Sequence, residues 1–395
     1  MMLEQPCRKC ITHIPRQLSQ SSMCNEMYNV FGWFTVQNAV TLVHGPQGCI
    51  SSAFGINYFT KGKAKWYSTD LTEMEVILGG EEKLREALIL IDKQVGPEVI
   101  FIYTSCVSGI IGDDIASVVK QTQPEIGARL IPVVCEGFKK QQYHKGTDSA
   151  YQGIISYLLE DVQEDQTLVN VITSLSVNQF DVDEITRILS SIGLTPNFIP
   201  CFATLDNIRK SASAKATIPI SHSFNEYFVN YLNNKHNVQP EEYLIPQSVG
   251  STDRWLIQLA KMLNRSTGAK TFIEQEHRKI EPDINALKAA LSGKRIFVGA
   301  NLTIAESIGE LSNDFGFEII GLKDYLKIKG TGTFDQTCFT DLANILHFEQ
   351  ANVLRYLKPD LYLTRGLSIP YASVSGVPTV SIFDNQCANL GYRGA

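Results

Sequence analysis

The chain has 395 residues, of which 44% are hydrophobic and 19% are charged, and its formal net charge at pH 7 is −6. This length exceeds that of one ordinary domain, so we expect two or three domains with large cores. The acidic balance argues against nucleic acid as a partner, and no apolar run approaches the roughly 20 residues of a membrane span. The first residues have no apolar signal-peptide core, so we expect a cytoplasmic protein that binds neither nucleic acid nor membrane.

Short apolar runs rich in β-branched residues alternate with helical patterns along the chain, as is typical of buried parallel strands joined by helices. In chain order, the predicted strands are residues 39–45, 98–106, 130–136, 168–173, 198–204, 294–301, 317–322, 360–366 and 378–383. Apolar stripes and end signals predict helices over residues 82–95, 181–194, 253–265 and 283–294.

The alternation of strand and helix predicts an α/β fold with mainly parallel sheets. Polar stretches near residues 160–167 and 275–294 interrupt the pattern. We therefore expect three Rossmann-like domains, over residues 1–165, 166–290 and 291–395. Because ligands of such sheets bind beyond the carboxyl ends of the strands, residues at those ends are the first candidates for a site.

Cysteines occupy two of these strand ends. A reducing compartment disfavours structural disulfides, so the nine cysteines are buried apolar thiols, metal ligands or reactive thiols. Cys49 follows the first predicted strand, Cys106 ends the second, and Cys24 precedes both. Gly45 and Gly48 let the backbone approach a bulky inorganic group, and their N–H groups can donate to cluster sulfur. These positions suit thiolate ligands of iron or zinc, while the alternative of small buried hydrophobes stays open.

Several motifs in fixed order resemble the N-terminal domain of the nitrogenase component 1 family. They are Cys24, HGPQGC (44–49), YSTDLTEMEVILGGEEKL (67–84) and CVSGIIGDD (106–114), with a weaker match through KPDLYLTRG to the final LGYRG. That family includes both dinitrogenase subunits, the scaffold of cofactor assembly and the tetrapyrrole reductases. The HG-x-QGC form looks most like the β-type subunit of dinitrogenase.

The resemblance implies that Cys24, Cys49 and Cys106 hold one subunit's half of an interfacial iron–sulfur cluster, lined by Gly45 and Gly48. In dinitrogenase this is the P-cluster, of 8Fe–7S type, and in the tetrapyrrole reductases it is a 4Fe–4S cluster. A homologous α-type subunit, in an α2β2 heterotetramer, would supply the remaining ligands. An ATP-dependent 4Fe–4S iron protein would deliver electrons, since this chain has no G-x(4)-G-K-S/T phosphate-binding motif.

The sequence departs from the α-type subunit, which binds its catalytic cofactor through a middle-domain cysteine and a C-terminal histidine. Segment 215–224 contains Ser221 and His222 but no cysteine, and segment 381–394 contains Cys387 but no histidine. His222 is either a ligand or a satisfied polar residue, and the role of Cys387 is likewise open.

The remaining signals have structural interpretations. Cys7 and Cys10 form a C-x-x-C that marks either an arm without ligands or an extra metal site. We expect three further cysteines, Cys135, Cys201 and Cys338, to be core thiols. Two adjacent acids, Asp113 and Asp114, are expected to cap a helix, and the glycine pair Gly79–Gly80 is expected to end one.

Two functions from the family follow, and the missing cofactor ligands favour the first. It is a subunit of a nitrogenase-like reductase, an oxidoreductase that relays low-potential electrons from the iron protein to a substrate-reducing site. The alternative is a non-catalytic scaffold subunit for maturation of the nitrogenase cofactor. A third possibility is an α/β binding protein with buried cysteines. The sequence indicates neither the catalytic residues nor the substrate, whether dinitrogen, a tetrapyrrole or an organosulfur compound.

Overall fold

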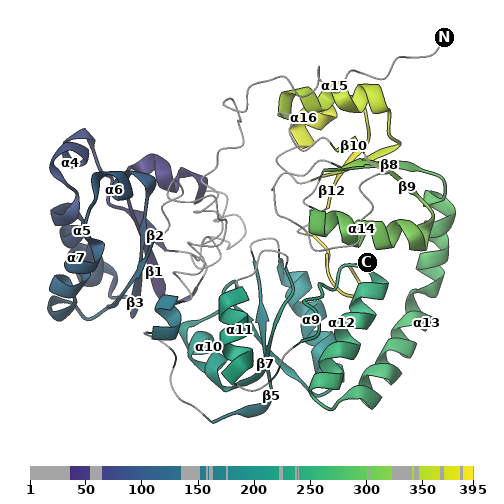
Figure 1. Cartoon of the computed structure of the whole chain (residues 1–395), viewed down its shortest axis with the longest axis horizontal. Coiled ribbons are helices and arrows are strands. Elements are labelled where there is room, and N and C mark those ends of the chain that lie inside the picture. Colours follow the sequence, from purple (N-terminus) through teal and green to yellow (C-terminus); the bar gives the residue numbers. More distant parts are fainter. Residues whose placement is uncertain are drawn as a thin grey trace. The chain divides into compact units, whose positions relative to one another are not determined.

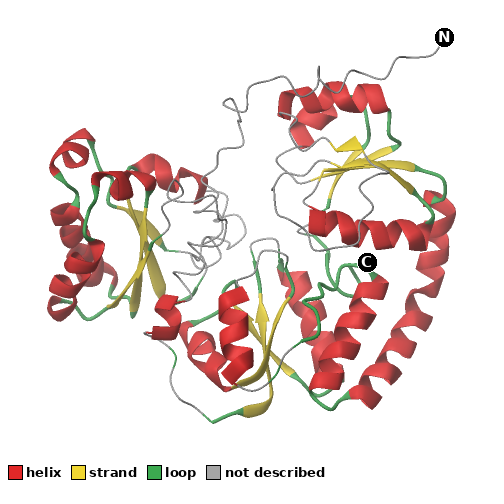
Figure 2. Ribbon diagram, in the orientation of Figure 1, coloured by secondary structure: helices red, strands yellow, loops and turns green. Residues whose placement is uncertain are grey.

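A computed structural model gives the structure of the chain. It describes residues 36–53, 65–134, 152–156, 159, 163–174, 177–221, 226–235, 238, 240–299, 302–322, 340–341, 347–364, 369–382 and 386–394. The described residues form two compact units (Figures 1 and 2). The first unit takes in the described parts of Met23–Asn178 and Gly193–Tyr243. The second combines Gln179–Ile192 with the described part of Leu244–Ala395.

The strands of the described residues form three sheets in which every pairing is parallel. The first, in the order β2-β1-β3-β4, contains β1 (Ala39–His44), β2 (Trp66–Ser68), β3 (Val99–Thr104) and β4 (Arg129–Val133). The second, in the order β6-β5-β7, contains β5 (Asp165–Ile172), β6 (Thr195–Ile199) and β7 (Ala214–Pro219). The third, in the order β10-β9-β8-β11-β12, contains β8 (Arg295–Gly299), β9 (Glu318–Leu322), β10 (Thr340–Asp341), β11 (Leu361–Thr364) and β12 (Thr379–Ser381). The predicted α/β class with parallel sheets is confirmed.

Helices connect these strands. The α-helices are α4 (Glu73–Leu78), α5 (Glu81–Val95), α6 (Cys106–Ile111), α7 (Ile115–Thr122), α9 (Gln179–Ser191), α10 (Leu205–Lys210), α11 (Glu226–Lys235), α12 (Val249–Met262), α13 (Ser266–Leu291), α14 (Leu302–Phe315), α15 (His347–Leu357) and α16 (Ile369–Ser373). Three segments of the described residues are 3-10 helices: η3 (Gln47–Ala53), η4 (Gln123–Glu125) and η5 (Ser211–Ser213).

Both faces of the first sheet are covered, which is why its central strands β1 and β3 are apolar and buried along their whole length. Leu42, Ile100 and Ile102 pack in one cluster with apolar residues of α5 and α7, and Figure 1 shows these helices along one side of the sheet. On the opposite face, Phe101 and Tyr103 join a second apolar cluster. The sheet is therefore a rigid support for the loops at its carboxyl edge.

The predicted elements differ from the observed ones where the local pattern is weak. The strand predicted over 198–204 lies earlier, at Thr195–Ile199, because Pro200 has no N–H with which to extend the ladder. The helix predicted over 283–294 is the last part of α13, which continues through Pro282. The short strands β2 and β10 and the strand β7 were not predicted. Apart from Asp165, the first residue of β5, each sheet lies within one predicted domain range, but that division stays a prediction.

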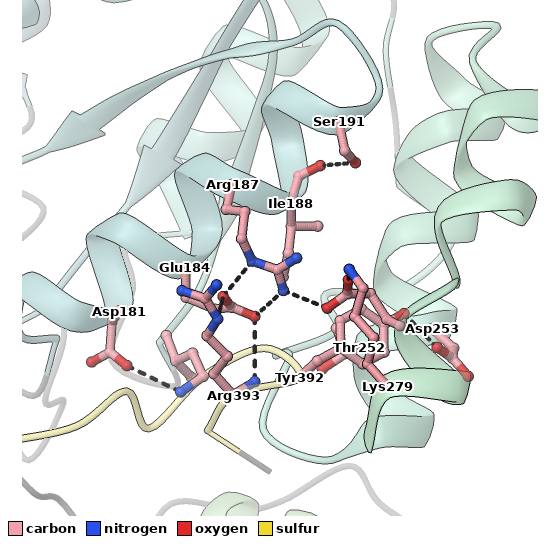
Figure 3. A network of polar contacts seen from close by, with 12 residues as sticks. Asp181, Glu184, Arg187, Ile188, Ser191, Thr252, Asp253, Lys279, Tyr392 and Arg393 are labelled. Carbon is pink, nitrogen blue, oxygen red and sulfur yellow. Dashed lines mark hydrogen bonds and ion pairs between the residues drawn. The ribbon is translucent and has the colours of Figure 1, made fainter. Parts of the chain in front are cut away.

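In the second unit, the C-terminal LGYRG segment is fixed to α9 by buried carboxylates (Figure 3). Asp181 accepts hydrogen bonds from the backbone N–H groups of Asn389 at 2.5 Å and Leu390 at 3.0 Å. Glu184, also buried, accepts one from the N–H of Arg393 at 3.3 Å. The weak C-terminal part of the family pattern is therefore a packing element of this unit.

Tyr392 of the same segment contacts both α12 and α13, through Asp253 and the ring of Phe272 respectively. The Tyr392 hydroxyl donates to Asp253 Oδ1 at 2.5 Å, and burial together with that carboxylate raises the pKa of Tyr392, which keeps the donor proton in place. Arg187 of α9 bonds Glu184 at 2.8 Å and Glu276 of α13 at 2.7 Å. Opposite charges thus compensate one another in this buried region.

Two glycines with the same left-handed backbone conformation, one inside this segment and one outside it, allow a test of how closely the segment is packed. A Cβ at Gly391 (φ +73°) would lie 2.6 Å from Glu184 Cγ, whereas one at Gly376 (φ +79°) would meet no heavy atom of the described residues within 4 Å. Both alanine variants carry the strain of a left-handed backbone, about 1–2 kcal/mol. We expect Gly391→Ala to lower the free energy of unfolding by about 2 kcal/mol more than Gly376→Ala, measured by urea unfolding. Equal losses of unfolding free energy in the two variants would show that the segment shifts to accommodate a methyl group without loss of stability.

Candidate functional site

The loop that carries Cys49 begins where β1 ends. We call residues 45–53 the Cys49 loop. After His44 the chain turns at Gly45 and Pro46 and enters the 3-10 helix η3, with the Cys49 N–H donating to the Pro46 carbonyl at 3.0 Å. Cys49 is half-buried and packs against the apolar cluster on that face of the sheet. The thiol therefore lies at the carboxyl edge of the sheet, as predicted from the sequence.

The pairing of β1 with β3 brings the second cysteine to the same edge. His44 and Thr104 are register partners at the ends of the two strands, and the next N–H, of Ser105, donates to the His44 carbonyl at 3.1 Å. Ser105 caps the N-terminus of α6, and Cys106 is the first residue of that helix. Cys106 is also half-buried. Two of the three predicted ligands thus lie just beyond the ends of neighbouring strands.

The two thiols are close enough to affect each other. Burial raises the pKa of Cys49, the Cys106 thiol raises it further, and the Ser105 hydroxyl lowers it in part. By themselves these groups favour a protonated thiol. A metal ion reverses this preference, because a coordinated thiol is deprotonated. The donor set of two neighbouring thiols with a hydroxyl close by fits an iron–sulfur cluster.

The two glycines of the loop differ in their surroundings. A Cβ at Gly45 would lie 2.3 Å from Ser105 Oγ and 3.7 Å from Cys49 Sγ. A Cβ at Gly48 would have no neighbouring heavy atom within 4 Å in the described part of the chain. The approach of Ser105 therefore explains why Gly45 has no side chain. That either glycine contacts a cluster stays a prediction.

Several candidate residues lie outside the described residues. They are Cys24, Cys7, Cys10, Cys135, Cys338 and His222. Within the described ranges there is no group of three or more histidine, cysteine, aspartate or glutamate side chains that could hold a metal, so the three-cysteine site stays a prediction. Cys201 is buried, as expected of a core thiol, and Cys387 is exposed.

A buried histidine–aspartate pair lies beside the Cys49 loop, and the sequence analysis did not identify it. His44 Nε2 is 2.8 Å from Asp113 Oδ2, and the two side chains are 0% and 3% exposed. The other carboxylate oxygen of Asp113 accepts the Gly80 N–H at 2.9 Å. Asp114 caps α7 through the Ser117 N–H at 3.0 Å, as predicted. The expectation that Asp113 is also a cap is wrong, because its carboxylate faces His44 and Gly80 instead.

The hydrogen bonds of His44 define its protonation. Burial lowers the pKa of His44 below its ordinary value of 6.5, although Asp113 opposes this, so we assign a neutral ring. Its Nε2–H then donates to Asp113, and Nδ1 accepts from the Thr69 hydroxyl at 3.1 Å. Thr69 Oγ1 also accepts the Gly45 N–H at 3.0 Å. Three segments of the family pattern, HGPQGC, EVILGG and IGDD, therefore meet in one network.

The glycine pair ends one helix and begins the next, as predicted. Gly79 (φ +100°) follows α4, and Gly80 precedes α5. A Cβ at Gly80 would lie 2.8 Å from Asp113 Oδ2 and 3.0 Å from His44 Cε1. A side chain at this position is excluded by the histidine–aspartate pair.

Comparison with known proteins decides the family. The pattern of the Nitrogenase component 1 type Oxidoreductase family matches residues 30–395. The chain belongs to this family. Members of the nitrogenase component 1 family bind iron–sulfur clusters. The predicted resemblance is thereby confirmed. In the described part of the chain, no helix is both long and apolar enough to cross a membrane.

Individual relatives are distant but extend over most of the chain. The chain is 28% identical to the nitrogenase iron-molybdenum cofactor biosynthesis protein NifE of Methanococcus maripaludis, over 91% of this chain and 78% of that protein. It is also 28% identical to NifE of Clostridium pasteurianum, over 80% and 72%. It is 27% identical to the nitrogenase molybdenum-iron protein alpha chain of Methanosarcina barkeri, over 74% of this chain and 57% of that one. These relatives favour the NifE and α-chain side of the family over the β-type suggested by the Cys49 loop.

A solved structure shows the same fold. A chain of "Nitrogenase Cp1 at pH 5" superposes with a TM-score of 0.76 at 20% sequence identity, covering 93% of this chain and 85% of that one. At this identity the likeness establishes the arrangement of strands and helices of the nitrogenase component 1 family.

The two loop glycines provide a matched test of the site. We expect Gly45→Ala to lower the free energy of unfolding of the metal-free chain by about 1–3 kcal/mol, because its methyl group overlaps Ser105. Gly48→Ala is expected to change it by no more than about 0.5 kcal/mol. Urea unfolding of both variants measures the difference. A stable Gly45→Ala variant would contradict the close approach of Ser105 to the Cys49 loop.

Proposed function

We propose that the chain is a subunit of a scaffold complex on which a nitrogenase iron–sulfur cofactor is matured and then handed on. The observation that carries this proposal is the similarity to cofactor biosynthesis proteins NifE over 91% of the chain. The absence of a cysteine from segment 215–224 and of a histidine from segment 381–394 is compatible with a scaffold as well as with the reductase that it favoured in the sequence analysis. A protein that releases its cofactor is served by fewer permanent ligands than an enzyme that keeps it.

In this proposal Cys24, Cys49 and Cys106 hold a permanent cluster at the interface with a homologous subunit. The geometry supports the assignment for two of them, because Cys49 in the loop after β1 and Cys106 at the start of α6 lie at one sheet edge, with Ser105 nearby. The bound cluster would store and pass on low-potential electrons. The protein's part is to fix the ligands, to donate hydrogen bonds to sulfur and to limit solvent access.

An exposed apolar surface close to these cysteines supports a protein partner. Met74, Ile77 and Leu78 of α4 are 60%, 76% and 76% exposed, and Ile110 of α6 is 70% exposed. We call these four residues the α4–α6 patch. Ile110 lies one helical turn from Cys106 on the same short helix. Apolar residues exposed together mark interaction sites, and we assign this one to the ATP-dependent iron protein, because a docked donor would then lie near the cysteines.

Two observations support a second possible function, that of a subunit of a nitrogenase-like reductase. The family is described as an oxidoreductase family, and the chain resembles the α chain of the M. barkeri molybdenum-iron protein. In that case the same cysteines would relay electrons from the iron protein to a substrate-reducing site. The two functions share the cluster and differ in whether the complex turns over a substrate or releases a cofactor.

The first experiment purifies the chain anaerobically with its partner subunit, from cells that do not make the cofactor to be matured, and measures iron and sulfide. We expect about four irons per chain for a shared eight-iron cluster, or about two for a shared four-iron cluster. Iron is expected to fall to near zero in Cys49→Ala and to be retained in Cys387→Ala, which removes an exposed thiol elsewhere in the chain. Iron-free wild-type complex would overturn the cluster assignment.

A second measurement separates the two functions. The loaded complex is incubated with cofactor-free dinitrogenase, and acetylene reduction by that dinitrogenase is followed. A scaffold activates it and loses metal from itself. The reductase function predicts no activation, and instead ATP-dependent turnover of a substrate by the complex with the iron protein alone.

The α4–α6 patch makes a separate prediction. Leu78→Asp places a charge on the patch, and we expect it to weaken binding of the iron protein by about tenfold, since central apolar residues dominate interfaces. The matched control is Leu90→Asp on α5, which is also exposed but lies outside the patch. Binding is measured by sedimentation or interferometry under anaerobic conditions. Equal effects of the two changes would assign the iron protein to another surface.

A further inference from the structure

Helix α4 is fixed by hydrogen bonds at both of its ends. None of its residues is buried, and three of its apolar side chains form most of the α4–α6 patch. Its first turn is closed by a capping box between Thr72 and Glu75. Its last turn runs into Gly79 and Gly80, and the Gly80 N–H is bonded to Asp113. A docked protein that shifts α4 would therefore also shift the turn at Gly79 and Gly80.

From that turn, a continuous series of buried hydrogen bonds leads to the Cys49 loop. It runs from Gly80 through Asp113, His44 and Thr69 to the N–H of Gly45, with every distance between 2.8 and 3.1 Å. The His44 ring and the Asp113 carboxylate are buried, so no water competes for these bonds. No free space separates Gly80 from the side chains of His44 and Asp113, so a displacement of Gly80 would move these side chains too.

At the other end, Gly45 is held on both its polar groups. Its carbonyl accepts from the Ser68 hydroxyl at 3.0 Å and the Leu71 N–H at 3.1 Å. Gly45 packs against Ser105, and a Cβ at Gly45 would lie 2.3 Å from Ser105 Oγ and 3.7 Å from Cys49 Sγ. Movement of the histidine–aspartate pair would therefore change the position of the Cys49 loop.

We infer that His44 and Asp113 are positioning residues that couple a protein bound at α4 to the Cys49 loop. The identities of that protein, the iron protein, and of the group at Cys49, the cluster, rest on the proposed function. Docking at α4 would alter the surroundings of a ligating sulfur, which is one of the means by which proteins tune cluster potentials. The coupling itself belongs to this chain and exists without either partner.

The first test uses the metal-free chain and the alkylation rate of each cysteine by iodoacetamide, resolved by mass spectrometry of peptides. Asp113→Asn removes the anionic acceptor of His44, whereas Asp114→Asn makes the same change one residue later, in the cap of α7. We expect Asp113→Asn to raise the rate at Cys49 by about tenfold and Asp114→Asn to leave it within about twofold of wild type. Buried Cys201 is the internal control, because general unfolding of the unit would expose it too.

A second pair of variants covers the case in which Asp113→Asn unfolds and Cys201 reacts in parallel. Thr69→Val removes the hydroxyl that joins His44 to Gly45 and keeps the shape, and Thr69→Ser keeps the hydroxyl. Thr69→Val should raise the rate at Cys49 and Thr69→Ser should not. Unchanged Cys49 rates in folded Asp113→Asn or Thr69→Val chain would overturn the inference.

The second test uses the loaded complex and the electron paramagnetic resonance spectrum of its cluster. Addition of the iron protein with nucleotide should shift the spectrum in wild type and Asp114→Asn but not in Asp113→Asn, at equal iron content. A shift of the same size in Asp113→Asn would contradict the coupling. Wild-type complex without iron would refute the proposed function, while the alkylation test would still decide whether the histidine–aspartate pair holds the Cys49 loop.

Discussion

The candidate site depends on the parallel register of β1 and β3. The two strands pair residue for residue over their whole length, so they end at the same level, and the backbone hydrogen bond from Ser105 to His44 continues the ladder one step beyond the strands. That bond sets where the Cys49 loop and helix α6 diverge. Because both strands are buried on both faces, the register cannot slip without moving apolar side chains out of two cores.

The sequence predicts this part of the structure well because its signals are local. Apolar runs define β1 and β3, and parallel strands with helical connections place the residues that follow them at one edge. Cys49 and Cys106 could therefore be placed at the carboxyl ends of two strands from the sequence alone. The same reasoning identifies the glycine turn after α4 and the cap at Asp114, which depend on neighbours within a few residues.

The histidine–aspartate pair could not be predicted in this way. Asp113 and Asp114 are adjacent acids before a helix, and capping chemistry alone does not distinguish them. Asp113 differs from Asp114 in its partner, His44, which lies 69 positions away. In the sequence, His44 is predicted only as the end of a strand. Weak strands such as β7 were missed for a related reason: β7 owes its stability to long-range pairing with β5 rather than to a marked apolar pattern. The branch of the family likewise required comparison of whole chains, because the Cys49 loop alone suggested the β-type.

The attachment of residues 389–393 to α9 has a consequence for the order in which the chain folds during translation. Asp181 and Glu184 are buried carboxylates whose partners include backbone groups 208 and 209 positions later. While the ribosome is still making the intervening segments, these two acids lack those partners, and a buried carboxylate without hydrogen bonds is costly. Met23–Asn178 and Gly193–Tyr243 have already emerged by then. The nascent chain can therefore complete the unit that carries Cys49 and Cys106 first, whereas the other unit can close only after residues 389–393 have been made.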